Sequence, residues 1–297
     1  MSTKPVALTI AGSDSGGGAG IQADLKAMEA NGVFGASALA AVTAQNTEEV
    51  SRAHDLPPSL VAAQIDAVVG DMDVQAAKTG MLSAPPIIET VADRVATHDL
   101  RPFVVDPVMI SKTGFKLLQD EAIDTLVNDL LPLATLVTPN VHEAEHLTDV
   151  EIDTPDDLRA AGAALLEYGP DAVLVKGGHL SGADDAVDVL VDGETGRRFQ
   201  APRIDTEHTH GTGCTYASAI AAHLATGEAV RNRCHPPRPA ARTWPGAHEP
   251  LFPPRPRGGP CRRRRDRRVD GAARPHQREH FVRMPRGGSF AFRGACE

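Results

Sequence analysis

The chain has 297 residues, and the 41% that are hydrophobic suffice for the core of one large α/β domain or two smaller ones. Its net charge of −9 hides two unlike parts: residues 1–230 carry 13 Lys and Arg against 34 Asp and Glu, whereas residues 231–297 carry 17 Arg and 5 acids. The acidity of the first part argues against nucleic acid or an anionic membrane as a partner of the globular part. Four cysteines without a Cys-x-x-Cys pair, and a first apolar run too short for a signal peptide or a membrane span, predict a cytoplasmic protein.

Short apolar runs alternate with amphipathic stretches, a spacing typical of βαβ units. The predicted strands are residues 6–11, 35–42, 76–79, 103–105, 136–138 and 172–175, followed by a hairpin of 187–191 and 197–201. The predicted helices are residues 21–29, 60–69 with Ser59 as its N-cap, 86–97, 120–128, 141–147, 156–167 and 216–225. This order predicts an α/β protein with three layers, in which helices flank a mostly parallel central sheet.

Polar clusters follow six of the predicted strands. They are Gly12-Ser13-Asp14, Gln45-Asn46-Thr47, Lys78-Thr79-Gly80-Met81, Asp106-Pro107-Val108-Met109, Thr138-Pro139-Asn140 and Lys176-Gly177-Gly178-His179. Because ligands of open parallel sheets bind at the carboxyl ends of the strands, we expect these clusters to line one cleft.

The segment Thr-His-Gly-Thr-Gly-Cys-Thr at 209–215 is the strongest chemical signal of the chain. Gly211 and Gly213 allow consecutive backbone N–H groups to face one anion as the next helix begins, which suits a transferring phosphoryl group. Cys214 lies in the first helical turn, where the helix dipole favours a thiolate, so we interpret it as a base. The alternative is an ordinary loop with Cys214 as a small apolar filler.

Residues 142–146, His-Glu-Ala-Glu-His, match the H-E-x-x-H signature of zinc hydrolases. We rank this interpretation low, because the motif directly follows a buried strand and no clear helix with a third ligand comes after it. Asp106, Asn140 and Glu143 are better explained together as oxygen ligands, direct or through water, of Mg²⁺ on a triphosphate. Asn140 is also a good helix cap with Glu143 in the first turn, and both roles are compatible.

The glycine-rich loop at 12–20 fits neither common nucleotide-binding fingerprint, because the loop contains no Lys and Ile21 stands where a final Gly belongs. We expect a flexible loop that closes over a small ligand, with a plain tight turn as the alternative.

The side chain of Gln45 offers both a hydrogen-bond acceptor and a donor, which suits the edge of an aminopyrimidine ring, although a surface-loop glutamine explains it equally. Lys176 precedes two glycines, from where it can reach a phosphate as a point charge.

Taken together, these motifs resemble the hydroxymethylpyrimidine/phosphomethylpyrimidine kinases of thiamine biosynthesis, within the ribokinase-like superfamily. The resemblance covers residues 5 to about 228 and rests on segments 7–14, 17–26, 43–47, 78–82, 106–109, 138–140, 176–179 and 210–215. It implies an enzyme that uses ATP and Mg²⁺ to phosphorylate 4-amino-5-hydroxymethyl-2-methylpyrimidine and then its monophosphate. Such transfers need positioning and charge neutralisation more than covalent chemistry.

The resemblance also implies residue roles. Gln45 would read the pyrimidine, and the same pocket would be lined by Gly12, Asp24, Met81 and Val108. Cys214 would take the proton of the hydroxymethyl group, and the anion hole would be formed by Gly211, Thr212 and Gly213. Lys176 would contact the nucleotide phosphates, and Mg²⁺ would be organised by Asp106, Asn140 and Glu143.

The chain departs from this family after the last predicted helix, where relatives continue with helices that cover the adenine side. Residues 231–297 hold 11 of the 23 prolines and the run Arg262-Arg263-Arg264-Arg265, without apolar periodicity. We interpret residues 1–230 as a kinase domain without its C-terminal helices. We predict that 231–297 is a disordered, irregular tail, and prefer out-of-frame translation of GC-rich coding sequence over a basic arm for nucleic acid.

Two alternative functions stay open. One is a pyridoxal- or pyridoxine-type vitamin kinase of the same superfamily, against which Gln45 and Met81 argue. The other is a non-catalytic pyrimidine-binding remnant, because the C-terminal part is altered. The oligomeric state, a homo-oligomer included, and the nucleotide preference also stay open.

Overall fold

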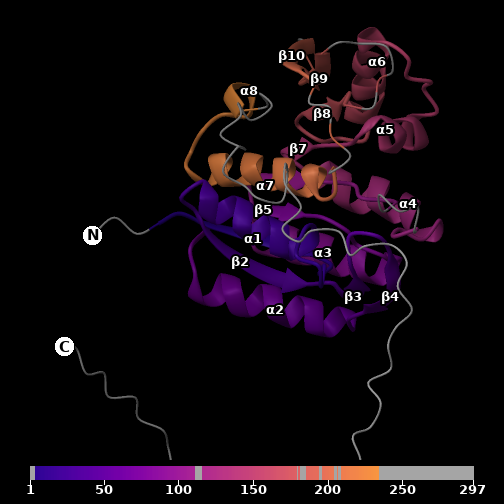
Figure 1. Cartoon of the computed structure of the whole chain (residues 1–297). Helices are drawn as coiled ribbons and strands as arrows, with labels where there is room; N and C mark the ends of the chain where they lie inside the picture. The colour runs from indigo at the N-terminus through magenta and orange to yellow at the C-terminus, as the bar shows by residue number, and fades with distance from the viewer. Residues whose placement is uncertain are drawn as a thin grey trace, which may run out of the picture. The chain divides into compact units, whose positions relative to one another are not determined.

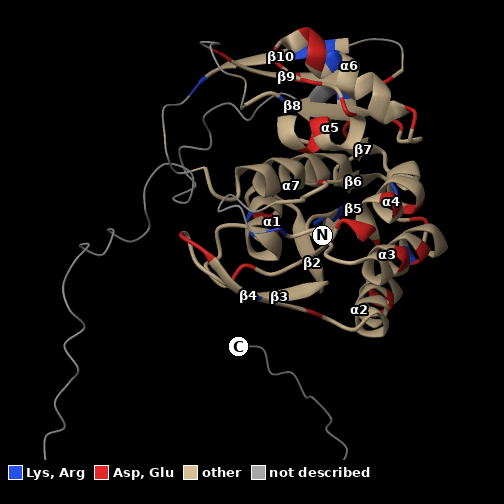
Figure 2. Ribbon diagram, turned by 90° about the vertical axis from the view of Figure 1, so that its right-hand side faces the viewer, with Lys and Arg blue, Asp and Glu red and all other residues tan. Residues whose placement is uncertain are grey.

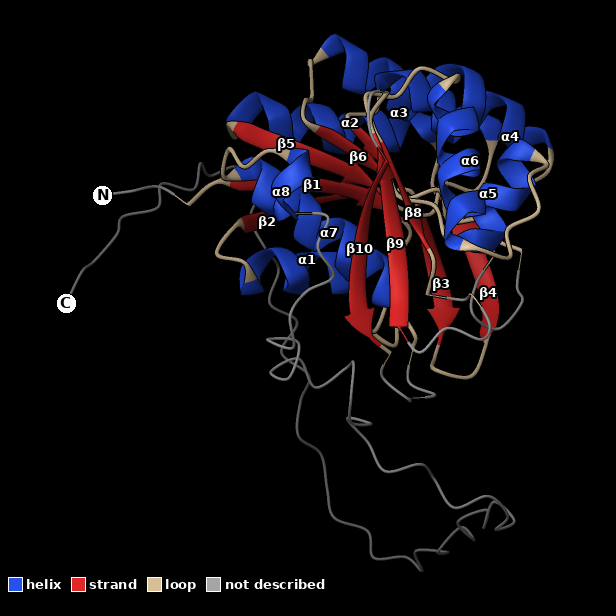
Figure 3. Ribbon diagram, turned by 90° about the horizontal axis from the view of Figure 1, so that it is seen from above, coloured by secondary structure: helices blue, strands red, loops and turns tan. Residues whose placement is uncertain are grey.

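The computed structural model describes residues 4–110, 116–178, 180, 185–193, 196–203, 206 and 209–233. Within this part of the chain, eight strands form one sheet in the order β10-β9-β8-β7-β6-β5-β1-β2, drawn in red in Figure 3. Their bounds are β1 Val6–Ala11, β2 Phe34–Leu39, β5 Val74–Thr79, β6 Phe103–Val105, β7 Leu136–Val137, β8 Val173–Lys176, β9 Asp185–Val191 and β10 Gly196–Pro202. Neighbours from β2 to β8 pair in parallel, and β9 and β10 complete the sheet as antiparallel strands. The predicted mostly parallel sheet is therefore confirmed.

Helices cover both faces of this sheet (Figure 1). One face carries α1 Gly20–Ala30 and α7 Thr212–Ala225, which pack against each other and against β1 and β5. The other face carries α2 Pro58–Asp71, α3 Pro85–Thr97, α4 Glu121–Thr125, α5 Val141–Thr148 and α6 Pro155–Leu166. The chain after α4 continues through a π-helical turn, Leu126–Leu130, and a 3-10 turn, Leu131–Leu133, and α8 Val230–Arg233 follows α7. The three predicted layers are confirmed.

Strand alternation distributes the apolar side chains between two cores. In β1, Leu8 and Ile10 belong to the core under α2–α6, whereas Ala7 belongs to the core under α1 and α7. Alanines dominate the buried side of α7, so this helix lies close to the sheet. Figure 2 shows acidic residues spread over α3, α4, α5 and α6, in keeping with the acidic composition of residues 1–230.

A second, smaller sheet consists of β3 Ala41–Gln45 and β4 Val50–Asp55, paired antiparallel. The prediction of one strand over 35–42 is wrong, because β2 ends at Leu39 and β3 begins at Ala41. Residues 38–42, Ala-Leu-Ala-Ala-Val, are all apolar, so hydrophobicity gives no sign of the boundary between the two strands. The prediction missed β4, whose side chains are mostly exposed and show no alternation.

The N-cap predicted for the second helix is also wrong. The helix α2 begins at Pro58 with Pro57 as its N-cap residue, so Ser59 lies inside the first turn. The fixed φ of proline favours the first helical position, and here it decides where the helix begins.

The chain divides into one unit spanning Met1–Pro253, to which every described residue belongs, and a second spanning Pro254–Glu297, which lies outside the described residues. The predicted tail at 231–297 lies outside the described residues except for 231–233, at the end of α8. The domain boundary, the disorder and the out-of-frame origin therefore stay predictions. None of the described helices is long and apolar enough to cross a membrane.

Candidate active site

The predicted anion-binding segment forms the N-terminus of α7. Gly211 is the N-cap, with φ +75° in the left-handed region, and Thr212 is the first helical residue. A Cβ at Gly211 would lie 1.8 Å from the carbonyl oxygen of Gly18, so only glycine fits there. The first N–H groups of a helix have no acceptor within it, and here they belong to Thr212, Gly213 and the residue that follows.

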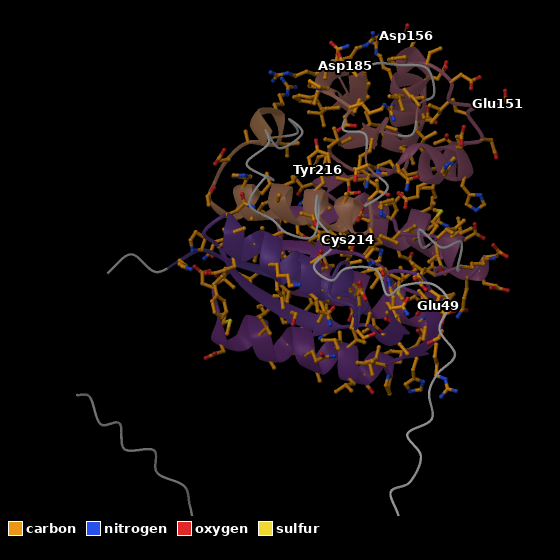
Figure 4. The ribbon with its side chains drawn as sticks, in the orientation of Figure 1. Glu49, Glu151, Asp156, Asp185, Cys214 and Tyr216 are labelled. Atoms are coloured by element: carbon orange, nitrogen blue, oxygen red, sulfur yellow. The ribbon has the colours of Figure 1, made fainter. Side chains whose placement is uncertain are left out.

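Cys214 lies in this first turn, at the beginning of α7 in Figure 4. The backbone N–H of Gly20, the first residue of α1, is hydrogen-bonded to its thiol. Burial raises the pKa of Cys214 to about 11; the positive charge of Lys78 opposes this, and the negative charge of Asp24 adds to it. The helix-dipole argument predicts a favoured thiolate, but burial raises the pKa of Cys214 more than Lys78 and the Gly20 N–H lower it, which favours the neutral thiol at pH 7.

An ion pair lies next to this turn. The Nζ of Lys176, at the end of β8, donates to Oδ1 of Asp106 over 2.9 Å, and Thr138 Oγ1 donates to the same oxygen over 3.1 Å. Burial opposes ionisation of Asp106, but Lys176 and Lys78 outweigh it and lower the pKa of that carboxyl group. A Cβ at Gly213 would lie 3.4 Å from Lys176 Nζ, so the ammonium group lies against the N-terminus of α7.

Asn140 and Glu143 form a capping box at the beginning of α5. The Asn140 Oδ1 accepts from the Glu143 backbone N–H over 2.9 Å, and Glu143 Oε2 accepts from the Asn140 backbone N–H over 2.8 Å. The capping role expected from the sequence is confirmed. Burial raises the pKa of Glu143 to about 7; Lys176 opposes the shift and the charge of Asp106 adds to it. The positive charge of Lys176 therefore acts on two carboxyl groups, those of Asp106 and Glu143.

The H-E-x-x-H motif does not converge on one point. His142 and His146 are exposed on α5, whereas Glu143 is buried on the other side of the helix as part of the cap. Within the described residues, no group of three His, Cys, Asp or Glu side chains is arranged to hold a metal ion. The structure therefore shows Glu143 in the cap of α5 rather than beside the two histidines.

Two of the predicted pocket residues are in contact at the carboxyl ends of β1 and β5. The Gly12 N–H donates to the Met81 carbonyl oxygen over 3.2 Å, and a Cβ at Gly12 would lie 3.0 Å from Met81 Cε. Val108, two residues after Asp106, is partly exposed beyond β6. His179, the last residue of one predicted cluster, lies outside the described residues.

Gln45 ends β3 and is held by the glycine-rich loop. Ser15 Oγ accepts from the Gln45 N–H over 2.7 Å and donates to the Gln45 carbonyl oxygen over 2.6 Å. Thr43 Oγ1 lies 3.2 Å from Gln45 Oε1 and donates to the Ser13 carbonyl oxygen over 2.7 Å. With its carbonyl group near this hydroxyl, the Gln45 amide can present its NH₂ group to a ligand.

Asp24 has a side chain that lies in the protein interior, unlike those of the other predicted pocket residues. Its side chain is fully buried between the sheet and α7, where it accepts from Lys78 Nζ over 2.9 and 3.0 Å. Thr9 Oγ1 and Ser218 Oγ each donate to it over 2.7 Å. Asp24 therefore joins α1, β1, β5 and α7 in the protein interior, a role that the sequence did not reveal because these three partners are 15 to 194 positions away in the chain.

The family model described as phosphomethylpyrimidine kinase matches residues 14–235 of this chain. The chain belongs to this family. It is 55% identical over 228 residues to the hydroxymethylpyrimidine/phosphomethylpyrimidine kinase of Streptomyces coelicolor, which covers 77% of this chain and 84% of that protein. It is 51% identical over 224 residues to the thiamine biosynthesis bifunctional protein ThiED of Geobacter sulfurreducens, covering 75% of this chain and 46% of that protein.

Solved structures of kinases share the fold. The phosphomethylpyrimidine kinase of Clostridium difficile matches with a TM-score of 0.70 and 43% identity, over 78% of this chain and 95% of that chain. The pyridoxal kinase of Bacillus subtilis, in its ADP complex, matches with a TM-score of 0.72 and 38% identity, over 78% of this chain and 88% of that chain. The predicted ribokinase-like fold is confirmed.

Proposed function

We propose that this chain transfers the γ-phosphoryl group of ATP to the hydroxymethyl group of 4-amino-5-hydroxymethyl-2-methylpyrimidine, and a second phosphoryl group to the resulting monophosphate, in thiamine biosynthesis. The observation that carries the proposal is the meeting of Cys214, Lys176 and the N-terminus of α7 at the carboxyl ends of the parallel strands. Membership of the phosphomethylpyrimidine kinase family supports the choice of substrate. The free thiol of Cys214 suits a reducing compartment, so we assign the activity to the cytoplasm.

Charge on the transferring group is stabilised from two sides. The N–H groups of Thr212 and Gly213, directed by the turn at Gly211, bind the phosphoryl oxygens, and that of Thr212 gives up a long bond of 3.4 Å to the Thr209 carbonyl oxygen. Lys176 adds a positive charge beside them, and its pair with Asp106 fixes its ammonium group before the nucleotide arrives. Preorganised donors of this kind supply most of what phosphoryl transfer requires.

Cys214 receives the proton of the hydroxymethyl group. With a pKa of about 11, only on the order of one thiol in ten thousand is ionised at pH 7, so the thiol must lose its proton before it can act. Lys78 and the Gly20 N–H stabilise the thiolate once it forms. We therefore expect turnover to increase with pH across the neutral range.

Gln45 reads the pyrimidine edge, with Gly12, Met81 and Val108 around the ring. The glycine-rich loop that holds Gln45 also approaches the N-terminus of α7, so one loop borders both the ring-binding side and the phosphoryl-binding side of the site. Asp24 supports this pocket from behind, since its carboxylate is fully engaged in the interior.

The residues at the site suit a magnesium ion bound to the nucleotide. Asp106 and Glu143 offer carboxylate oxygens, the ligands that Mg²⁺ prefers, directly or through water. Burial raises the pKa of Glu143 and the charge of Asp106 adds to the shift, so a divalent cation bound here would favour the ionised carboxylate. The Asn140 amide oxygen is engaged in the cap of α5, so it would act through water. When bound, the ion neutralises charge on the phosphates.

A pyridoxal-type kinase is the second candidate, because pyridoxal kinase structures match this fold with TM-scores up to 0.72. The higher identity to pyrimidine kinases and the presence of Gln45 favour the pyrimidine. A non-catalytic pyrimidine-binding remnant is the third.

The deciding experiment is a coupled assay of ADP release by the full chain with ATP and Mg²⁺, run separately with the pyrimidine alcohol and with pyridoxal. Calorimetry with each alcohol and no ATP accompanies it. We expect turnover with the pyrimidine and its monophosphate. Turnover with pyridoxal alone would support the second candidate, and pyrimidine binding without ADP release would support the third.

A further inference from the structure

A histidine next to the anion-binding turn is bonded to a carboxylate in the glycine-rich loop. His210 Nε2 lies 2.9 Å from Asp14 Oδ2, although the two residues are 196 positions apart in the chain. The side chain of Asp14 is 1% exposed and that of His210 20% exposed. Both belong to the motifs of this family, yet neither has a role in the function proposed above.

The Asp14 carboxylate organises the loop that contains it. It accepts from the backbone N–H groups of Gly16, Gly18 and Ala19 over 2.7, 3.1 and 2.8 Å. Burial opposes its ionisation, but the bonds from His210 and the loop outweigh burial and lower the pKa of Asp14. The loop is therefore wrapped around a charged carboxylate, and His210 is the partner from outside it.

The same loop touches both halves of the site. On one side, Ser15 holds the backbone of Gln45 at the end of β3. On the other side, the Gly18 carbonyl lies so close to Gly211 that a side chain there would collide with it. The loop is thus the mechanical connection between the residue that reads the pyrimidine and the turn that binds the phosphoryl group.

We propose that Asp14 and His210 are positioning residues, which fix the distance between the pyrimidine-reading strand β3 and the phosphoryl-binding turn of α7. This inference rests on the proposed function. Neither side chain touches the reacting atoms; each acts through the loop and the turn. Displacement of a reacting group by about 1 Å costs on the order of 10²-fold in rate, so a small movement of the turn is enough to slow transfer.

The test compares two variants in which His210 is replaced by a different side chain. His210→Phe keeps a ring of similar size and removes the bond to Asp14, whereas His210→Gln places an amide nitrogen near the position of Nε2. We expect His210→Phe to lower kcat on the order of 10- to 100-fold while KM for the pyrimidine changes about twofold or less. We expect His210→Gln to recover most of the loss, since it restores the bond.

A double-mutant cycle and a measurement of hydrogen–deuterium exchange complete the test. In a cycle with Asp14→Asn, the double variant should lose less activity than the two single losses multiplied together, because both changes weaken the contact between residues 14 and 210. Hydrogen–deuterium exchange should become faster at residues 12–20 and 209–216 in His210→Phe. The exchange can be read without turnover, so an inactive wild-type chain would contradict the proposed function and leave the coupling of the two segments testable.

Three results would overturn the inference: an unchanged kcat in His210→Phe, a loss that His210→Gln does not recover, or exchange at residues 12–20 that does not respond to the loss of the ring nitrogen. A change in KM with kcat preserved would equally overturn it, because it would assign the pair to ligand affinity.

Discussion

The ammonium group of Lys78 and the carboxylate of Asp24 form an ion pair of 2.9 Å in which neither side chain is exposed. Thr9 and Ser218 complete the bonds to the carboxylate. Ser218 is four residues after Cys214, one helical turn along the same face of α7. The pair therefore fixes α7 against β5 and holds a positive charge behind the thiol.

Removal of Asp24 should strongly destabilise the protein. Asp24→Ala leaves the ammonium group of Lys78 buried without a partner, and we expect the free energy of unfolding to fall by about 3–5 kcal/mol in urea denaturation. The control is Lys4→Ala, which breaks an ion pair whose side chains are 54% and 62% exposed, and should cost less than about 1 kcal/mol. Equal losses in the two variants would contradict the central role of the buried pair.

Removal of Lys78 should make the thiol less acidic. Lys78 is the group whose charge most lowers the pKa of Cys214, so Lys78→Met should slow alkylation of Cys214 by iodoacetamide at pH 9. The alkylated peptide is quantified by mass spectrometry, which separates Cys214 from the other three cysteines. Lys116→Met, which removes the partner of Asp120 on the surface, serves as the control. An alkylation rate in Lys78→Met equal to that of the control would exclude the electrostatic effect.

Loss of the thiol should affect chemistry and spare binding. Cys214→Ala is expected to lower kcat on the order of 10²- to 10⁴-fold, as for removal of a general base, while the affinity for the pyrimidine measured by calorimetry stays within about threefold. In the wild type, kcat/KM should rise with pH from 6 to 9, since the pKa of Cys214 is near 11. Variant and wild type with equal kcat would remove Cys214 from the mechanism.

Glu143 should make the folded state less stable as pH rises. Its pKa is about 7 in the folded chain against 4.5 in the unfolded chain, so the folded state binds more protons between these values. Its contribution to stability is therefore present below about pH 4.5 and is lost as pH rises through 7. Glu143→Gln keeps an acceptor for the cap of α5 and removes the titration. In magnesium-free buffer, we expect the wild type to lose stability relative to Glu143→Gln between pH 5 and pH 7, and parallel pH profiles would refute the shift.

Gly211 should tolerate no side chain. Gly211→Ala forces a Cβ against the Gly18 carbonyl and a residue with φ +75° into the left-handed region, so we expect turnover to fall on the order of 10²-fold or more. Gly227→Ala is the matched control, because Gly227 has φ +84° and nothing within 4 Å of its added Cβ. The control carries the backbone strain without the collision. Kinetics and melting curves of both variants give the measurement, and equal activities would show that the contact with Gly18 is dispensable.

Local signals in the sequence predicted much of this structure. The parallel strands are short apolar runs, and β6 lies at the residues expected for it. The capping box of α5 follows from the spacing of Asn140 and Glu143 alone. The boundary between β2 and β3 was missed because no polar residue or turn signal separates them.

The properties of the candidate site also divide into those that local sequence predicts and those that tertiary contacts decide. The sequence by itself determined most of the elements and the turn at Gly211, because periodicity, glycine and helix caps act over a few neighbouring residues. Only the tertiary structure decided that Asp24 is an interior ion-pair partner, that Cys214 is a neutral thiol and that Asp14 meets His210. These properties depend on desolvation and on charges brought together from distant parts of the chain, and no local pattern encodes those distances.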